Sequence, residues 1–455
     1  MIASLQERLR FARALKSRPY AMIWLGQTIS GLGDGIFYIA LAWQVLLMTH
    51  SGTAMGIVLV ASTIPRLVFM LIGGVTADRL PRRMIILWSD GGRGLVVLLI
   101  SLLGFTNPLQ FWHLVVESLL FGLVDGFFTP AILAITPDLV EKDDLPSANA
   151  LVSISSNVTQ LIGPMLGAGL VAWISPMGAF ALNGLSFLLS VAFLLPVQIP
   201  ERHVRSVPAE ISQPESERVL VASGGEVVKE NASEGSRAEA SEAEEKPRGV
   251  RGVIADVREG LFYVRSSRWL WVSILLLSLG NMGVVGSLTV AMPKLVHDVY
   301  GQGAWLLGLF NAVGPVGSLL ALVLVGQAKR LKRRGLIAYL SLIPAGAGLV
   351  LFGLPWSVPA FVVVGILASA MFGFSVAFFN TTWFTILQEM IPGDKLGRVI
   401  SLDALGSFAL TPLAEAFGGV LTDRVGPAMV FVLGGSLALT TNFLPLLVRE
   451  VREME

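Results

Sequence analysis

Long apolar stretches recur along nearly the whole chain, separated by short breaks that are charged or rich in Pro, Gly and Asn. Each stretch reaches the roughly 20 residues that a helix needs to cross the hydrocarbon core of a bilayer. The breaks predict spans at 20–48, 54–80, 84–105, 110–137, 146–174 and 177–197. A second group is predicted at 268–297, 303–328, 335–354, 358–390, 396–422 and 426–448. We therefore expect an all-α membrane protein of about twelve transmembrane helices in two six-helix bundles.

The segment between the two groups changes abruptly to Glu, Ser, Ala, Gly, Arg and Pro, and residues 208–247 contain no aromatic side chain. Such a composition cannot bury enough apolar area to offset its conformational entropy, so 199–252 is predicted to be a disordered cytoplasmic linker. Apolar side chains then recur at helical spacing, which favours a surface helix before the seventh span. The expected domains are one bundle over 1–198, the linker, and the surface helix with the second bundle over 253–455.

A weak internal repeat supports this division. Phe121-Gly122 recurs as Phe372-Gly373, and at the same separation Gly167 recurs as Gly418. One register that runs through two spans and a loop implies two structurally equivalent halves, as in transporters built from repeated bundles.

Composition removes the alternative of a water-soluble protein, because 14% of the residues are charged where a soluble domain carries about 25%. The chain has no cysteine, which excludes disulfides and thiol chemistry. Lys and Arg gather after spans 2 and 8 and between spans 10 and 11, whereas the intervening loops lack them. The positive-inside rule then predicts a multi-pass protein of the plasma (inner) membrane with both termini cytoplasmic.

The break after the second span carries the most specific motif, Gly74-Val75-Thr76-Ala77-Asp78-Arg79-Leu80-Pro81-Arg82-Arg83. It resembles the loop signature of the major facilitator superfamily, from which Thr76 and Pro81 depart. The resemblance implies a cytoplasmic gate formed by Gly74, Asp78, Arg79, Arg82 and Arg83, in which the carboxylate caps the start of helix 11. A helix N-terminus favours an anion through its free amides and its dipole. Topology anchoring is the competing explanation for the arginines.

Span 5 contains Gly163-Pro164-Met165-Leu166-Gly167, which is similar to an element that the family associates with antiporters. Close helix packing without any bearing on transport direction is the alternative.

The span 4 signature of many drug exporters is absent, since Ser118 and Phe121 occupy its Arg and Gln positions. The chain instead resembles the branch that includes macrolide-efflux proteins and the enterobactin exporter. That likeness is carried by Trp24-x-Gly26-Gln27, Leu32-Gly33-Asp34, Asp125-Gly126-Phe127-Phe128, Ala148-Asn149 and Gly397-Arg398-Val399.

Charged side chains inside predicted spans are costly and mark candidate functional sites. At 1.5 Å of rise per residue, Asp34, Arg66 and Asp125 all fall roughly 18–21 Å from the cytoplasmic end of their spans, in one layer near mid-membrane. We expect Asp34 and Arg66 to pair, with Asp125 nearby, and the set to couple proton movement to transport. A permanent structural ion pair is the alternative. Glu117 and Glu415 lie nearer the outer side, where they would bind a cationic substrate, relay protons or stay solvated.

Other charged groups are given lesser roles. Asp90, Arg93 and Asp403 lie nearer the cytoplasmic side and are assigned to the gate or to local pairing. The histidines occupy loops or span ends, so none suits a central proton relay: His50, His113, His203 and His297.

The resulting hypothesis is a secondary transporter that exports a bulky amphiphilic organic compound, such as a drug, a macrolide-like or a siderophore-like molecule, by proton antiport and alternating access. An uptake or lysolipid-translocating carrier and a transport-dead receptor or scaffold remain as alternatives. No catalytic cluster, metal site or cofactor motif is found, so an enzyme is not expected. The expected partners are a small-molecule substrate, protons and the lipid bilayer, with no nucleic acid, and the expected state is a monomer.

Overall fold

The computed structural model describes residues 10–197, 250–327 and 333–452, and these residues are almost entirely helical. The predicted linker over 199–252 falls almost wholly outside the described residues. The predicted gate residues Asp78 and Arg79 lie on a described helix, but their side chains are not described.

The first half begins with a short 3-10 helix and continues with six long helices. They are η1 (Arg10–Lys16), α2 (Arg18–Thr49), α3 (Gly52–Arg79), α4 (Arg82–Thr106), α5 (Phe111–Leu139), α6 (Leu145–Trp173) and α7 (Pro176–Leu194), with η2 (Lys142–Asp144) before α6. Polar caps define several starts: the side chains of Ser17, Ser51 and Ser175 each accept a hydrogen bond from a first-turn amide of α2, α3 and α7.

The second half begins with α8 (Val250–Ser266). Its seventh span is continuous but changes winding, through α9 (Arg268–Val285), the π-helical η4 (Gly286–Ala291), α10 (Met292–Lys294) and the π-helical η5 (Leu295–Val299). The chain continues through α11 (Ala304–Gln327), α12 (Arg334–Phe352), α13 (Val358–Met390), α14 (Gly393–Ala409), α15 (Thr411–Val425), α16 (Pro427–Phe443), η6 (Leu444–Leu447) and α17 (Arg449–Arg452).

The expected membrane fold is confirmed, because 11 helical stretches among the described residues are long and apolar enough to cross a bilayer. Two of them, Arg268–Val299 and Lys395–Val425, each join several helical segments into one span, as the hydrophobic pattern predicts. The remaining predicted span is α6, which is 29 residues long and packs against α2 and α11. It falls outside the apolar set because one stretch of it is polar, at Ser153, Ser155, Ser156, Asn157, Thr159 and Gln160.

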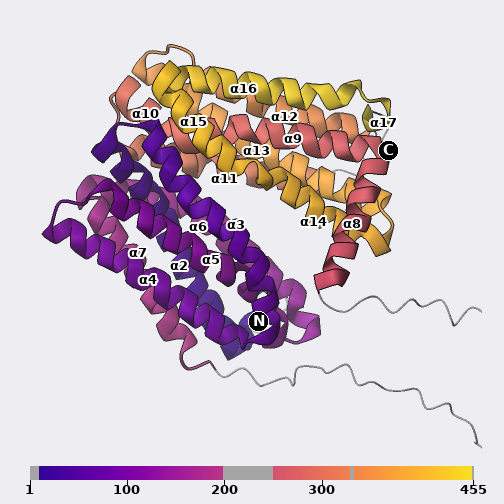
Figure 1. Cartoon of the computed structure of the whole chain (residues 1–455), viewed down its shortest axis with the longest axis horizontal. Coiled ribbons are helices and arrows are strands. Elements are labelled where there is room, and N and C mark those ends of the chain that lie inside the picture. The colour runs from indigo at the N-terminus through magenta and orange to yellow at the C-terminus, as the bar shows by residue number, and fades with distance from the viewer. Residues whose placement is uncertain (1–9, 198–249, 328–332, 453–455) are drawn as a thin grey trace, which may run out of the picture.

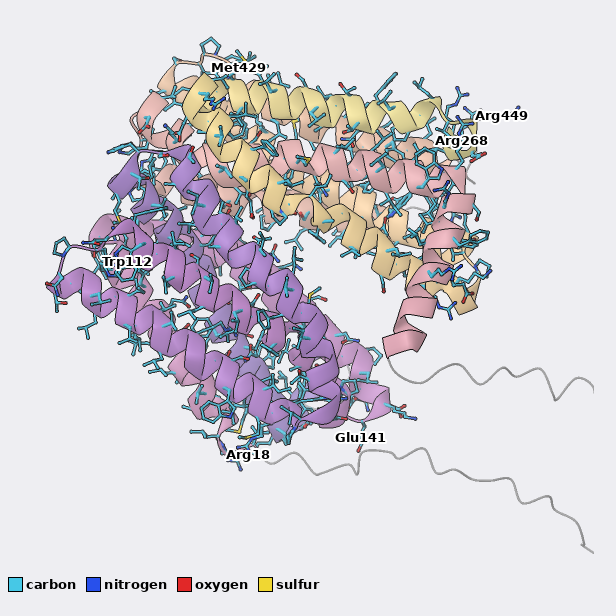
Figure 2. All side chains as sticks on the ribbon, in the orientation of Figure 1. Arg18, Trp112, Glu141, Arg268, Met429 and Arg449 are labelled. Atoms are coloured by element: carbon cyan, nitrogen blue, oxygen red, sulfur yellow. The ribbon has the colours of Figure 1, made fainter. Side chains whose placement is uncertain are left out.

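The two halves form separate bundles that meet at one end and diverge toward the other (Figure 1). We call the end that carries Arg18, Glu141, Arg268 and Arg449 the terminal end, and the opposite end, which carries Trp112 and Met429, the distal end. Figure 2 shows Arg18 and Glu141 of the first bundle well apart from Arg268 and Arg449 of the second. The structure is therefore closed between bundles at the distal end and spread apart at the terminal end.

The internal repeat corresponds to a repeated packing arrangement. A Cβ at Gly122 on α5 would collide with the carbonyl oxygen of Ser62 on α3, and a Cβ at Gly373 on α13 would collide with that of Gly314 on α11. In each half, therefore, the second and fourth helices cross where only glycine fits. Gly167 and Gly418 likewise allow the fifth helix of each half to approach the first, at Ile36 and at Gly286. The expected equivalence of the halves is present in the helix crossings.

Candidate functional site

A cavity of about 490 Å³ lies between the two bundles. The first bundle lines it with residues of α2 and α6, including Asp34, Tyr38 and Gln160, and the second lines it with residues of η4, α10, α11, α12 and α13, including Phe310 and Asn311. Its size falls in the range of pockets that bind small organic molecules. A mostly apolar wall with a few polar groups suits an amphiphilic ligand.

An ion-pair cluster inside the first bundle is centred on Arg93 of α4. Its guanidinium donates to Asp90 Oδ1 at 2.6 Å and to Asp125 Oδ1 at 3.1 Å, and Arg93 is 2% exposed. The same group lies over the rings of Phe128 and Phe187, with 4.2 and 4.6 Å between Cζ and the ring centroids. Two carboxylates and two aromatic faces thus surround one buried cation and offset the cost of removing its charge from solvent.

Polar side chains from two further helices complete the surroundings of Asp90. Its Oδ2 accepts hydrogen bonds from Gln27 Nε2 at 2.9 Å and from Ser190 Oγ at 2.7 Å. The cluster therefore ties α2, α4, α5 and α7 together.

Arg66 of α3 lies between this cluster and the second bundle. Its Nη1 is 3.9 Å from Asp125 Oδ2, and its side chain is half exposed. It also interacts electrostatically with Glu415 of α15, whose Oε1 accepts a hydrogen bond from Thr63 Oγ1 at 2.9 Å. Arg66 is thus the cation that faces one carboxylate in each bundle.

Asp34 connects the cluster to the cavity. It lines the cavity from α2, and it interacts electrostatically with Arg93, Asp125 and Asp90, with Asn183 as a neighbour. Its Oδ1 is buried and makes no hydrogen bond within the described part of the chain. Among the described residues no ion pair joins Asp34 to Arg66; both approach Asp125 instead. The expected layer is therefore assembled around Asp125, and Arg93 enters it as a fourth member.

The two glutamates expected nearer the outer side differ in their surroundings. Glu117 is 1% exposed and accepts from Ser118 Oγ at 3.2 Å, so it lies inside the first bundle and not in a solvated vestibule. Glu415 is 4% exposed and lies at the contact between bundles, close to Thr63. Only Glu415 of the two is placed where a movement of one bundle against the other would change its partners.

The small-residue element of span 5 serves contacts on two sides. A Cβ at Gly163 would lie 2.9 Å from Gly35 Cα on α2, so the glycine permits close packing within the first bundle. On the other side, a Cβ at Gly308 of α11 would lie 2.7 Å from the carbonyl oxygen of Pro164, which also lines the cavity. The element therefore lies at the contact between the bundles as well as inside one of them.

The arginines of the predicted gate hold neighbouring helix ends within the first bundle. Arg82 Nη1 donates to Asp138 Oδ2 at 2.6 Å and to the Ala134 carbonyl, both on α5. Arg83 donates to the carbonyl oxygens of Leu194 and Leu195 at the end of α7. Gly74 has open space around it. These contacts all lie within the first bundle, and both the topology anchoring and the capping of helix 11 by Asp78 stay predictions.

The start of α14, where the family places the partner of that gate, is covered by α8. Arg398 Nη1 pairs with Glu259 Oε2 at 2.6 Å, and Lys395 Nζ lies 5.2 Å from the centre of the Tyr263 ring. The predicted surface helix thus packs across the terminal end of the second bundle.

A helix cap joins the two bundles at the distal end, and no local sequence pattern predicts it. Asp423, at the end of α15, accepts hydrogen bonds from the amides of Gly52 at 2.7 Å and Thr53 at 2.8 Å, and from Ser51 Oγ at 2.6 Å. It also pairs with Lys294 Nζ at 2.8 Å. A carboxylate of the second bundle therefore caps the first turn of α3 in the first, where the free amides and the helix dipole favour an anion.

Two features of the structure are not predicted from the sequence: the contact of Arg93 with Asp125 and the cap formed by Asp423. Arg93 was assigned to the gate or local pairing, and its i,i+3 spacing from Asp90 does predict that local pair, but its contact with Asp125 depends on how α4 packs on α5. Asp423 follows directly after the predicted span 396–422 and stands next to Arg424, so in the sequence it looks like an ordinary loop charge, and no local signal distinguishes it. Trp383 of α13 is packed inside the second bundle, where its Nε1 donates to the Asp403 carboxylate at 3.3 Å.

Comparison with known proteins agrees with this architecture. The sequence profile of the Major Facilitator Superfamily matches residues 23–411. A protein named "Enterobactin exporter EntS" from Citrobacter koseri is 27% identical over 445 residues, which cover 96% of this chain and 94% of the relative. A protein of the same name from Escherichia coli O1:K1 is 27% identical over 436 residues, covering 93% and 89%.

Solved structures match along most of the chain. A bacterial homologue of the iron transporter ferroportin, in an inward-facing state, superposes with a TM-score of 0.62 at 17% identity and covers 94% of this chain and 98% of that one. The nucleoside transporter NupG gives 0.64 at 11% identity, covering 94% and 98%. At these identities the likeness shows the fold alone.

Proposed function

This chain belongs to the Major Facilitator Superfamily, and from that premise we propose that it is a secondary active transporter that exports a bulky amphiphilic organic compound of the siderophore class. The observation that carries the proposal is the cavity of about 490 Å³ between the bundles, which combines an apolar wall with Asp34, Gln160 and Asn311. The substrate class is supported by relatives that are named enterobactin exporters over nearly the whole chain.

We propose alternating access as the mechanism. In the present conformation the distal end is held shut by the Asp423 cap, and the bundles are spread at the terminal end. Basic residues gather at the terminal end, so we assign that end to the cytoplasm. The substrate would then enter from the cytoplasm and leave after the Asp423 cap opens and the terminal ends close.

Proton coupling is proposed for the carboxylates around Arg66 and Arg93. Asp125 lies between these two cations, and Asp34 reaches the same cluster from the cavity wall. Protonation of Asp34 or Asp125 removes one negative charge from the cluster. The attraction between Arg66 and the first bundle then weakens, and Arg66 interacts mainly with Glu415 on the second bundle. Such a change alters the attraction between bundles because charges in a low-dielectric region interact strongly. Proton antiport follows when the substrate binds only to the deprotonated cluster, because a proton and a substrate molecule then exclude each other.

The proposal is tested in proteoliposomes of the full chain with enterobactin as the probe and an imposed pH gradient. With the proteoliposome interior acidified, we expect enterobactin uptake by the molecules whose cytoplasmic side faces outward. This uptake should be lost in Asp34→Asn and Asp125→Asn while substrate binding is retained. Asp143→Asn, an exposed residue of η2, is the matched control and should transport normally. Gradient-driven movement in the opposite direction would indicate an importer, and full coupling in both variants would remove the cluster as the coupling site.

A further inference from the structure

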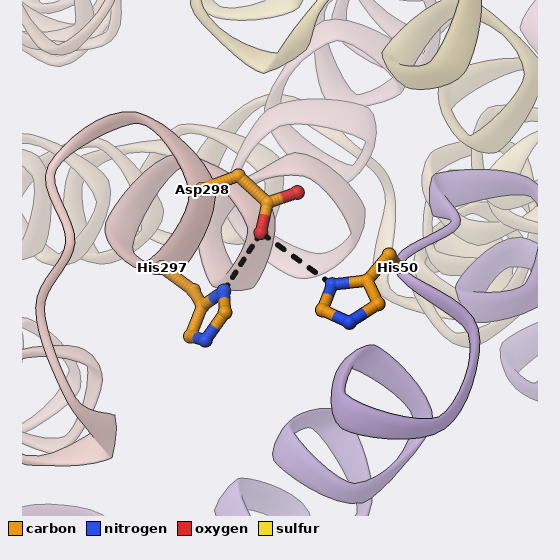
Figure 3. A group of neighbouring side chains, drawn as sticks. All are labelled: His50, His297 and Asp298. Carbon is orange, nitrogen blue, oxygen red and sulfur yellow. Dashed lines mark hydrogen bonds and ion pairs between the residues drawn. The ribbon is translucent and has the colours of Figure 1, made fainter.

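Three side chains with metal-binding groups come together at the distal end, outside the cavity and the ion-pair cluster. They are His50, which follows α2 in the first bundle, and His297 and Asp298, which lie on η5 in the second (Figure 3). His297 Nδ1 is 2.7 Å and His50 Nδ1 is 3.8 Å from the same oxygen, Asp298 Oδ1. One ligand atom of each residue lies within 4.8 Å of the others.

These separations fit a tetrahedral transition-metal site. Bonds of about 2.0–2.1 Å to nitrogen and carboxylate oxygen place tetrahedral ligand atoms about 3.3 Å apart. The two observed separations, 2.7 and 3.8 Å, lie on either side of that value. Small side-chain rotations would bring all three groups around one ion, with the fourth position open to water.

The donor set selects the class of metal. Two imidazoles and one carboxylate suit Zn²⁺ and its neighbours in the first transition row, whereas Mg²⁺ and Ca²⁺ prefer oxygen ligands. The three side chains are 61%, 32% and 28% exposed in the order His50, His297 and Asp298, so an ion can reach them from solution. Trp43 packs its ring edge-on against His297 at 5.4 Å between centroids, which restricts the orientation of that imidazole.

The backbone at both sides of the cluster is unusual. His50 has φ 49° and ψ 24°, the left-handed conformation that closes a helix and that normally selects Gly or Asn. A histidine at such a position costs free energy relative to glycine, and this kind of deviation accumulates at functional sites. His297 and Asp298 stand on a π-helical turn, a local irregularity that is also frequent at functional sites.

We propose that His50, His297 and Asp298 form a binding site for a divalent transition metal, of which Zn²⁺ is the probe, and that the bound ion joins the two bundles and holds the distal end closed. The ligands come from different bundles, so the site exists only while the distal ends are together. Binding is then linked to the conformation: the ion favours the closed distal end, and opening that end expels the ion. The inference needs no assumption about the transported substrate.

The first test is the binding of Zn²⁺ to the full chain, measured by titration calorimetry. The protein is purified through an affinity tag that contains no histidine. We expect one ion per chain, and at least ~10-fold weaker binding in His50→Asn and in His297→Asn, since each removes one of three ligands. His50→Asn is informative because Asn also favours the left-handed conformation and keeps the helix end intact. His113→Asn, at the distal start of α5, is the control and should bind as the parent does.

The second test measures the distance between bundles. The chain has no native cysteine, so spin labels can be placed at Asn107→Cys and Ser357→Cys, exposed positions at the distal ends of the two bundles. Zn²⁺ should narrow the distance distribution toward its short component, and His297→Asn should abolish this effect. Absence of binding, equal binding by the ligand variants and the parent, or a distance distribution that Zn²⁺ leaves unchanged would each overturn the proposal.

Discussion

At the scale of single residues, the first bundle is organised by one buried cation. Arg93 satisfies Asp90 and Asp125 and is covered by aromatic rings, so its charge is both neutralised and shielded. Arg66 has a longer contact with the same Asp125 and is half exposed. We therefore propose different roles for the two arginines: Arg93 is structural, and Arg66 exchanges partners.

Substitution should separate these roles. Arg93→Met leaves two carboxylates in low dielectric without their cation, and breaking such a buried set costs about 3–5 kcal/mol of stability. Arg66→Met should lower the unfolding temperature far less and should abolish gradient-driven transport. Thermal unfolding in detergent and transport in vesicles measure the two effects; equal losses of stability would show that both arginines are structural.

Asp423 is the second residue with a distinct prediction. Asp423→Asn removes the charge that faces the first turn of α3 and Lys294 but keeps an oxygen that accepts hydrogen bonds, so we expect a net loss of about 1–2 kcal/mol. We expect the distal end to open more often, by about 5–30-fold. A single cysteine at Gln160 on the cavity wall should then react faster with an impermeant maleimide added from the distal side. Glu141→Gln, exposed at the terminal end, should leave that rate unchanged, and an unaltered rate in Asp423→Asn would contradict the closing role.

At the scale of helices, close crossings replace an apolar driving force, since lipid is as apolar as the helix surfaces. Glycine at Gly122 and Gly373 lets backbone approach backbone in both halves. The unusual polarity of α6 has a related reason: Thr159 and Gln160 face the cavity, and Gly163 and Pro164 serve helix contacts. One helix therefore lines the cavity and also packs within its own bundle and against the second one.

The crossings predict an asymmetric response to alanine. Gly122→Ala and Gly373→Ala should each cost about 1–3 kcal/mol by overpacking, because the added methyl meets backbone that has little room to move. Gly91→Ala, on α4 with open space around it, should be neutral or slightly stabilising through helix propensity. The unfolding temperatures of the three variants test this prediction. Similar unfolding temperatures for all three would mean that the helices move apart at the crossings without a large loss of stability.

At the scale of the whole molecule, two bundles contact at the distal end and spread at the terminal end (Figure 1). Asp423, Glu415 and the His50 cluster all lie at the contact, each with groups from both bundles. Rigid movement of one bundle against the other would break these contacts together, as expected for a two-state change.

This arrangement predicts one-sided access to the cavity. We expect Gln160→Cys, on the cavity wall, to be labelled from the terminal side and protected from the distal side, because the bundles contact each other at the distal end. Saturating substrate should slow the labelling. Equal labelling from both sides in the absence of substrate would show that the distal contacts do not seal.

The sequence by itself determined the approximate number of spans and the two-bundle division of the apolar stretches. These properties are local: in lipid every span must satisfy its own backbone hydrogen bonds, so a run of apolar residues specifies a helix wherever it occurs. The family motif and the i,i+3 pair of Asp90 and Arg93 could be read for the same reason, since each depends on neighbours in sequence.

Only the tertiary structure decided which charges meet. Asp423 caps a helix that begins about 370 residues earlier, and His50 faces Asp298 across the bundle contact. The expected Asp34–Arg66 pair was inferred from depth alone, but depth leaves the rotation of each helix about its axis free. Side chains at one level can therefore point to different neighbours, and helix packing directs Arg66 toward Asp125 and Glu415 and brings Arg93 into the same cluster.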